Sequence, residues 1–490
     1  MKKILCLMIV AVFILETLIS CGHQNLIEET TDPSVTVTQE PAKIDSKTTV
    51  LPNHFEEGRH SGTTLKIYAA KFYNGSVIVQ QCPLEEREGD VIDQSLRERD
   101  RLFESFFGVN LQYRLEDYDE GWVMRDKIAN NVYADSNEFD LVFGSMFRMT
   151  GIHSNGWSHN LADIDMLDLE KNWWSQNARN AFTFNGNIYF STGDITTRYF
   201  SAPVVMEANV GLLRNNGINI EDIYQLVDDQ KWTIEELHKL IQGYGTDIDN
   251  DGIPEQTGLT QSGTGLHVLV YGCGGQFITR DEQGIPELNN SAGLIDIIDA
   301  VTAKFTTNGT LDVYYGVAPL ERNLFFYGKA LFATNTLCNL VDVSLHDFET
   351  TFLPMPKYNE EQANYYSNIN PYISTGIFIP KTLPADQTNR VGYLADGLAA
   401  ISKYTSSEEM YSRIIQYQKA TSPKAREMLI LCVENSQFEL AEVFDWGMNV
   451  TISVNNAIQN NASAKSTLDA VKESVDRKIR SDILNMQLGT

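Results

Sequence analysis

Cysteine is scarce in this chain of 490 residues, which contains six, two of them within the first 21 positions. The other four lie far apart and show none of the short paired spacings of a zinc site; they are Cys82, Cys273, Cys338 and Cys432. A chain of this length can build a core without a disulfide framework. We therefore expect these four residues to be buried free thiols.

Basic residues are also few. The chain has 38 Lys and Arg against 65 Asp and Glu, which gives a formal net charge of −27. Such acidity argues against DNA, RNA or an anionic membrane surface as the main partner. The 21 Tyr, 23 Phe and 6 Trp are mostly expected in the core. An acidic, aromatic-rich protein that is exported is nevertheless typical of carbohydrate binding.

The sequence lacks the motifs of common enzyme classes. We find no Gly-x-Ser-x-Gly elbow, no His-Glu-x-x-His pair and no phosphate-binding Gly-Lys-Ser/Thr loop. A glycosidase needs only two carboxylates, and so many acidic residues leave that possibility open. No segment favours it, and we do not expect an enzyme or a required cofactor.

The first residues lack a hydrophobic run long enough to span a membrane. The uncharged stretch from Ile4 to Leu15 has 12 residues, whereas a spanning helix needs about 20. A basic start followed by a short apolar run is typical of a secretory signal. Leu18 to Cys21 resembles the bacterial lipobox, which predicts cleavage after residue 20 and two acyl chains on Cys21. An ordinary signal peptide with an incidental cysteine is the alternative, and Glu16 departs from the usual pattern.

The segment after Cys21 shows no apolar periodicity. Residues 21–62 are rich in Thr, Ser, Pro and Glu, so we expect a flexible tether there. The remaining chain is too long for one core and predicts two lobes. We place lobe 1 at 63–190, lobe 2 at 191–350, and a hinge return with a mostly helical C-terminal part, packed on both lobes, at 351–490.

Apolar periodicity predicts strand, helix, strand, helix and strand at the start of the folded body. These elements are expected at 65–70, 91–107, 111–115, 122–133 and 139–145. This order is typical of a parallel sheet with helical crossovers. In such sheets, ligands bind at the carboxyl ends of the strands, which places Ala69–Ala70 and Gly144–Ser145 at the edge of a cleft.

Later segments continue the α/β pattern. We expect strands at 188–190 and 204–206, and Gly217 at the end of a short helix. Thr233 to Glu236 forms a capping box that begins a helix reaching residue 242. The last part of the chain, from about 389 to 487, is predicted to be mostly helical.

Several short motifs occur in a characteristic order. They are Asp163–Trp174, Phe184–Tyr189, Lys231–Thr233, Asp247–Gly252, Thr257–Leu259, Phe352–Lys357, Tyr365–Ser367, Ser422–Leu429 and Phe444–Gly447. Together they resemble the extracellular solute-binding proteins, family 1, of sugar-type ABC importers, in a long form common in Gram-positive anaerobes. Two departures are Thr257, where a tyrosine is usual, and Ala208-Asn209-Val210, where the family has Phe-Asn-Lys.

The resemblance implies a fold and a function. The implied fold is a two-lobed, type II-like periplasmic-binding-protein fold, with a mainly parallel, helix-flanked sheet in each lobe and hinge strands between them. The implied ligand is a mono- or oligosaccharide enclosed between the lobes, and the implied partner is an ABC permease. We expect a monomer, held by its lipid on the outer face of the membrane of a Gram-positive bacterium.

Candidate ligand-binding residues follow from the chemistry of sugars, whose C–H faces pack on aromatic rings while amides and carboxylates bind the hydroxyls. The candidates are Trp173, Trp174, Ser145, Asp194, Tyr271, Asn335 and Tyr372. Adjacent side chains diverge, so at most one indole of the tryptophan pair is expected to face the cleft. A purely structural role is the alternative for every residue of this set.

One acidic loop resembles the first half of a calcium-binding loop. Asp247, Asp249 and Asp251 alternate before Gly252, and Glu255 stands at the ninth position. The twelfth position, where such a loop needs a bidentate glutamate, is Gly258. A weak or structural calcium site and a solvated polar turn are both compatible with this pattern.

The sequence therefore favours a lipid-anchored receptor that captures a carbohydrate for a permease. Two alternatives from other classes stay open at this point. One is a surface glycosidase or polysaccharide-processing lipoprotein, and the other is a sensing or adhesion module on the same fold.

Overall fold

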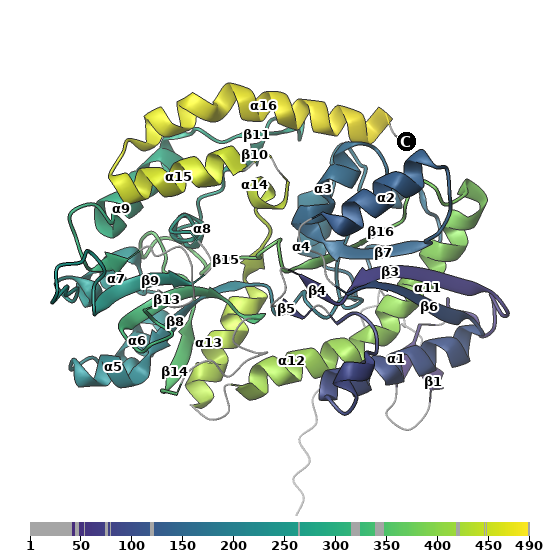
Figure 1. The fold of residues 1–490 in the computed structure, drawn as a ribbon, viewed down its shortest axis with the longest axis horizontal. Coiled ribbons are helices and arrows are strands. Elements are labelled where there is room, and N and C mark those ends of the chain that lie inside the picture. The colour runs from purple at the N-terminus through teal and green to yellow at the C-terminus, as the bar shows by residue number, and fades with distance from the viewer. Residues whose placement is uncertain are drawn as a thin grey trace, which may run out of the picture.

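Figure 1 shows the computed structural model of the chain, in which two lobes lie side by side. It describes residues 42–44, 49–52, 54–73, 77–78, 80–117, 122–262, 265–314, 324–338, 347–417, 422–444, 446 and 448–488. The expected signal peptide, Cys21, Asp445 and Gly447 lie outside the described residues. Within the described part of the chain, no helix combines the length and the apolar character that a membrane span needs.

Lobe 1 is built on a sheet with the strand order β16-β7-β3-β6. β3 is parallel to both β6 and β7, whereas β16 is antiparallel to β7. The elements are β3 (Thr64–Ala70), α1 (Val91–Phe107), β6 (Asn110–Glu116), α2 (Val123–Tyr133), β7 (Leu141–Ser145), α3 (Met146–Ser154), α4 (Gln176–Phe182), β16 (Thr375–Phe378) and α11 (Ala385–Lys403). The predicted order of strands and helices from residue 64 to 145 is confirmed for the main sheet, and the structure adds a short antiparallel pair, β4 (Phe72–Tyr73) and β5 (Val77–Ile78), between β3 and α1.

Local sequence signals account for the ends of helix α1. The carboxylate of Asp90 accepts a hydrogen bond from the backbone N–H of Ile92 at the start of the helix. Gly108 ends it in a left-handed conformation, with φ 66°, which a residue without Cβ adopts at little cost. The helix buries Phe103 and Phe107 against the sheet and α11.

Lobe 2 is built on a five-stranded sheet with the order β12-β9-β13-β8-β14. β9 is parallel to β12 and β13, and β8 is antiparallel to its neighbours β13 and β14. The elements are β8 (Val204–Asn209), α5 (Val210–Asn215), α6 (Ile220–Asp228), α7 (Ile234–Ile241), β9 (Thr257–Ser262), α8 (Val268–Gly272), β10 (Ile278–Arg280), β11 (Pro286–Leu288), α9 (Ala292–Phe305), β12 (Val313–Tyr314), β13 (Ala330–Thr336) and β14 (Thr350–Leu353). The predicted boundary at residue 350 falls at the first residue of β14.

The chain crosses between the lobes in segments that pair with one another. Residues 191–203 run antiparallel to residues 369–377, with bridges between Ser191 and Ile377 and between Pro203 and Ile369. A further crossing is made by α12 (Ser406–Tyr417), which packs against α1 of lobe 1 and against α13 (Pro423–Glu434). α13 in turn packs on β14 of lobe 2.

The C-terminal helices contact both lobes, as Figure 1 shows. Short strands β15 (Ser367–Asn368) and β17 (Ser436–Gln437) pair between the lobes, followed by α14 (Leu440–Val443), α15 (Met448–Asn460) and α16 (Ala464–Leu488). α15 packs on α9 of lobe 2, whereas α14 and α16 also reach α3 of lobe 1. The helical C-terminal part is therefore as the sequence predicts.

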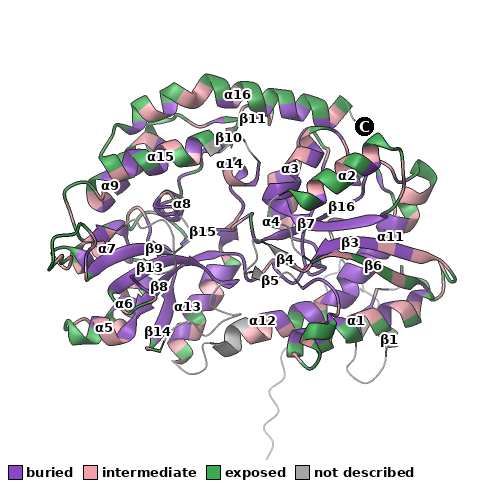
Figure 2. Cartoon of the chain, in the orientation of Figure 1, coloured by how far each residue is buried: buried purple, intermediate pink, exposed green. Residues whose placement is uncertain are grey.

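Most strands of the two sheets are buried, whereas the edge strand β6 is exposed or half-buried, and the helices expose their outer faces (Figure 2). Two details differ from the predictions. Residues 188–190 follow a tight turn and form an irregular connection with a bend at Tyr189, and not a strand. The folded part also begins before residue 63, because Leu51 and Phe55 are buried in the core of lobe 1.

Candidate functional site

The ends of the two sheets that face each other frame a cleft. In lobe 1, β7 ends at Ser145, which pairs with Thr375 at the start of β16. In lobe 2, the start of the antiparallel strand β8, Val204, pairs with the last residue of β13, Thr336. Since ligands bind at the carboxyl ends of parallel strands, this edge is where both lobes can contact one ligand.

A cavity of about 220 Å³ lies at this edge, and we name it the cleft cavity. Residues from both lobes, the crossing segment and the C-terminal helices line it: Phe147, Val204, Gly265, His267, Val268, Asn368, Asn370, Tyr372, Ala441, Glu442, Thr451, Ile452 and Asn455. The composition, with aromatic faces, amides and one carboxylate, is that of a small-molecule site with a few orienting polar groups.

Aromatic rings from lobe 1 form the apolar wall of the cleft cavity. The rings of Phe147 and Tyr372 stack, with centroids 4.1 Å apart and planes inclined by 28°. Trp122, at the start of α2, approaches Phe147 with a centroid distance of 6.0 Å. Trp122 and Tyr372 are each 40% exposed, so part of each ring is available to a ligand. Partly exposed rings at the edge of a cleft suit the C–H faces of sugars.

The polar side of the cleft cavity is organised around Glu442. Its carboxylate accepts hydrogen bonds from Nε2 of His267 at 2.6 Å and from Nδ2 of Asn368 at 2.9 Å. Two atoms of these partners, Nδ1 of His267 and Oδ1 of Asn368, are buried and have no hydrogen-bond partner among the described residues. Buried polar atoms of this kind are normally satisfied, so a ligand hydroxyl is a suitable partner for them.

A second cavity, of about 290 Å³, adjoins the first through Asn368 and is lined by Tyr271 and Glu439. Glu439 accepts hydrogen bonds from the backbone N–H groups of Phe277, Ile278 and Ala441. Burial nevertheless raises the pKa of Glu439 to about 8. Burial also raises the pKa of Tyr271 well above its ordinary value. This cavity therefore presents a carboxyl group that is mostly protonated at neutral pH.

The structure brings some of the predicted site residues to the cleft and holds others in the scaffold. Tyr372 lines the cleft cavity, and Tyr271 lines the adjoining one. Ser145 is buried, and its one hydroxyl hydrogen lies between the carbonyl groups of Pro371 and Tyr372, which positions the Tyr372 loop. Asn335 lies within β13, where its side chain donates to Glu207.

The two predicted tryptophans lie in the core. Trp173 and Trp174 are 4% and 3% exposed, and both indole N–H groups donate to Oδ1 of Asp396 at 2.7 Å. Asp396 belongs to α11 and is itself buried. In this arrangement the polar atom of each indole is occupied within the protein, so the sugar-stacking role stays a prediction that the observed geometry does not favour.

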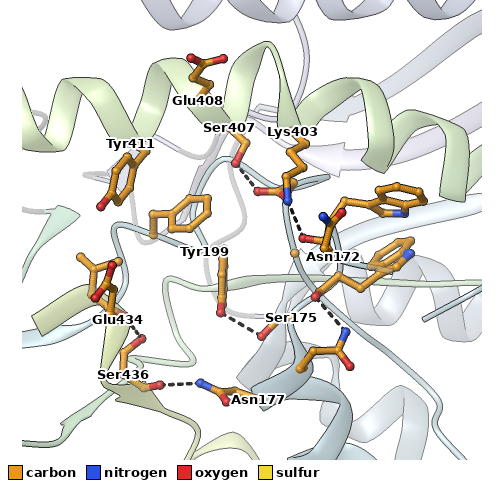
Figure 3. A pocket seen from close by; sticks show the side chains of 17 residues that line it. Asn172, Ser175, Asn177, Tyr199, Lys403, Ser407, Glu408, Tyr411, Glu434 and Ser436 are labelled. Atoms are coloured by element: carbon orange, nitrogen blue, oxygen red, sulfur yellow. Dashed lines mark hydrogen bonds and ion pairs between the residues drawn. The ribbon is translucent and has the colours of Figure 1, made fainter. Parts of the chain in front are cut away.

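Asp194 lies apart from the cleft cavity, in a larger cavity of about 530 Å³ that we name the hinge cavity (Figure 3). Its lining residues are Asn172, Trp173, Trp174, Ser175, Gln176, Asn177, Gly193, Asp194, Tyr199, Phe200, Lys403, Ser407, Glu408, Tyr411, Val433, Glu434 and Ser436. Burial raises the pKa of Asp194 to about 6, although Ser407 donates a hydrogen bond to it and Lys403 lies 4.0 Å away.

In the acidic loop, three of the four predicted metal-ligating carboxylates lie close together. One carboxylate oxygen from each of Asp247, Asp249 and Glu255 lies within 4.8 Å of the others. Asp251 is not in this group, and its Oδ1 accepts a hydrogen bond from the backbone N–H of Ile253. Asp247 accepts from the N–H groups of Asn250 and Gly252, so the carboxylates also close the turn.

Sequence reasoning missed Trp122, Phe147, His267, Asn368 and Glu442. Phe147 could have been predicted from the sequence, because it follows the carboxyl end of β7, where a ligand is expected to bind. For Trp122, the apolar periodicity predicts the first position of the helix 122–133 and no role in a site. For His267, Asn368 and Glu442, which lie in three distant parts of the chain, no local pattern marks the network that joins them.

No protein-family model matches the sequence, and no curated protein matches it significantly. Solved structures do match the fold. The cyclic α-maltosyl-1,6-maltose-binding protein of Arthrobacter globiformis superposes with a TM-score of 0.57 at 12% identity, over 85% of this chain and 99% of that one. The chain has the fold of the two-lobed solute-binding proteins.

Two further structures support the same fold. An ABC substrate-binding protein of Listeria monocytogenes, in complex with cycloalternan, gives a TM-score of 0.52 at 13% identity over 85% of this chain and 99% of that one. An acarbose-binding receptor of Streptomyces glaucescens gives 0.51 at 13% identity over 85% and 98% of the two chains. The expected two-lobed α/β fold is thereby confirmed.

Proposed function

We propose that this two-lobed protein is the carbohydrate-binding component of an ABC importer. The observation that carries the proposal is the cleft cavity, which is lined both by the Phe147–Tyr372 stack and by the hydrogen-bonded pair of His267 and Glu442. An aromatic wall opposite orienting polar groups is the arrangement that sugar rings require, with C–H faces on one side and hydroxyls on the other.

The structures that share the fold support the choice of ligand class. The proteins named above bind cycloalternan, cyclic α-maltosyl-1,6-maltose and acarbose, all of which are oligosaccharides or their analogues. We infer that this chain binds an oligosaccharide of the same general kind. Its cleft is lined from both lobes, so a bound sugar would favour the closed arrangement through contacts that only this arrangement provides.

Delivery to a permease and anchoring by lipid complete the proposal. The surface of the closed receptor differs from that of the open receptor, and a membrane permease can recognise this difference. ATP hydrolysis would belong to another subunit, since this sequence has no phosphate-binding loop. Diacylation of Cys21 would keep the monomeric receptor at the outer face of the cell membrane.

Calorimetry together with product analysis tests this function. The purified protein is titrated with maltotetraose, with a cyclic tetrasaccharide and with glucose, and the same mixtures are analysed by chromatography after prolonged incubation. We expect saturable binding of an oligosaccharide without any new product. Turnover would favour a glycosidase instead, and the absence of binding to every sugar would contradict the proposed ligand class.

A further inference from the structure

The hinge cavity is separate from the proposed carbohydrate site. At about 530 Å³ it falls within the size range of small-molecule sites, and it shares no lining residue with the cleft cavity. Its walls come from the segment before α4, from the crossing segment 191–203, from the junction of α11 with α12, and from the end of α13. Two routes of the chain between the lobes therefore border it.

Most hydrogen-bonding side chains of the hinge cavity are already occupied inside the protein. Ser175 donates to the hydroxyl of Tyr199, and Asn177 donates to the carbonyl of Ser436. Gln176 donates to backbone carbonyl groups, and Ser407 donates to Asp194. A neutral sugar needs free donors for its hydroxyl oxygens, and these bonds already use the hydroxyl protons of Ser175 and Ser407 and the amide N–H groups of Gln176.

Charge in the hinge cavity is predominantly negative. Its lining carries Asp194, Glu408 and Glu434 against a single basic residue, Lys403. The ammonium group of Lys403 donates to the carbonyl of Asn172 at 2.8 Å and faces Asp194, so it is held against one wall. Glu434 is exposed at the last residue of α13, and no ion pair with another described residue holds its carboxylate. In Figure 3, Glu434 lies on the same side of the cavity as Tyr411, whereas Glu408 points away from it.

Aromatic rings line the side of the hinge cavity that carries Glu434. Phe200 lies between two tyrosines, with centroid distances of 4.9 Å to Tyr199 and 5.7 Å to Tyr411. Its ring meets each of them at an angle above 60°. The faces of aromatic rings are negative and attract cations, most strongly where water is partly excluded.

We propose that the hinge cavity is a second binding site, which takes a small organic cation such as an aliphatic amine. The carboxylate of Glu434 neutralises the ammonium group, and the ring faces of Phe200 and Tyr411 contact its carbon atoms and its charge. The carboxylate of Glu434 disfavours an anion at this position. The aromatic row and the unpaired carboxylate together define this site, which is distinct from the carbohydrate cleft in position and in chemistry.

Titration of the purified full chain with 1,4-diaminobutane tests the proposal, with 1,4-butanediol as the uncharged probe of the same length. We expect the diamine to bind with saturation in calorimetry and the diol not to bind. Glu434→Gln and Tyr411→Ala should each weaken diamine binding on the order of tenfold. Glu282→Gln removes one negative charge from an exposed turn of lobe 2 and is the matched control, with an unchanged affinity expected.

Results that contradict the site are equally specific. Absence of saturation at millimolar diamine would overturn the proposed hinge site. Equal weakening of diamine binding by Glu434→Gln and Glu282→Gln would also overturn it, because this result indicates only long-range attraction to an acidic protein. The variant Tyr372→Ala separates this proposal from the proposed function. It should lose carbohydrate binding and keep diamine binding; loss of both would place the diamine in the cleft cavity and overturn the hinge site.

Discussion

The ring of Tyr372 lies stacked on that of Phe147, although 225 positions separate them in the sequence. The hydroxyl of Ser145 lies within hydrogen-bonding distance of the carbonyl oxygens of Pro371 and Tyr372, and it thereby holds the loop that carries the tyrosine. The stack thus joins the end of β7 to the segment that returns from lobe 2, and it forms the aromatic wall of the cleft cavity.

Removal of this wall should weaken carbohydrate binding. We expect Tyr372→Ala to lower the affinity for the best-bound oligosaccharide at least tenfold, or about 1.4 kcal/mol, because a sugar ring loses its stacking surface. Calorimetry measures the change. Tyr404→Ala is the control, since Tyr404 is exposed to a similar extent, 41% against 40%, and does not line the cleft cavity. Equal affinities for the two variants would contradict the assigned site.

Asp396 should be a major determinant of stability. Asp396→Ala leaves the indole N–H groups of Trp173 and Trp174 buried without an acceptor. Each unsatisfied buried donor costs about 1–3 kcal/mol, so for the two donors we expect the free energy of unfolding to fall by roughly 2–6 kcal/mol. Urea denaturation measures it. Asp386→Ala, at an exposed position of the same helix, should change it little. A loss below about 1 kcal/mol would show that the shared acceptor is unimportant.

Helices and strands can be predicted from the sequence where the residues that begin and end them are their direct neighbours in the chain. Helix α1 matches its predicted bounds because Asp90 and Gly108 cap it directly. The burial of Trp173 and Trp174 was not predictable, since their acceptor Asp396 lies more than 220 positions away. The residues of the candidate site show the same contrast between local signals and long-range contacts. Tyr372 is a candidate by residue type and lines the cleft cavity, whereas the partnership of His267 with Glu442 joins parts of the chain that are 175 positions apart.

Glu439 should make stability depend on pH. Burial raises its pKa to about 8 in the folded chain, whereas an exposed glutamate has a pKa near 4.5. Between these values the folded state holds a proton that the unfolded state has released, so the contribution of Glu439 to stability falls as pH rises from about 4.5 to about 8. Above and below this window, its contribution is constant.

Glu439→Gln should remove this dependence. We expect the variant to gain stability relative to the unmodified protein as pH rises from 5 to 8, by an amount on the order of 1 kcal/mol or more. Urea denaturation at several pH values measures the difference. Glu473→Gln, at a highly exposed position of α16, should show no such trend. A difference that stays constant across this pH range would contradict the raised pKa.

We propose that the acidic loop binds calcium weakly. Carboxylates of Asp247, Asp249 and Glu255 converge, and their mutual repulsion would be relieved by a divalent cation that accepts oxygen ligands. Millimolar calcium should raise the melting temperature, and Asp249→Asn should abolish the rise. Asp281→Asn, in another exposed turn of lobe 2, is the control that should retain it. An unchanged melting temperature in calcium would identify the loop as a simple polar turn.

Cys21 is proposed to hold the receptor at the cell surface, because its sulfur is the atom that a diacylglycerol group would modify. Cys21→Ala removes that atom and leaves the apolar run from Ile4 to Leu15, which we propose directs export, unchanged. We therefore expect the variant in the culture medium and the unmodified protein in the membrane fraction of a Gram-positive host. Cys82→Ala is the control, because Cys82 is a buried thiol of the folded part. Retention of the Cys21→Ala protein in the membrane fraction would mean that another contact, and not a lipid, anchors the chain.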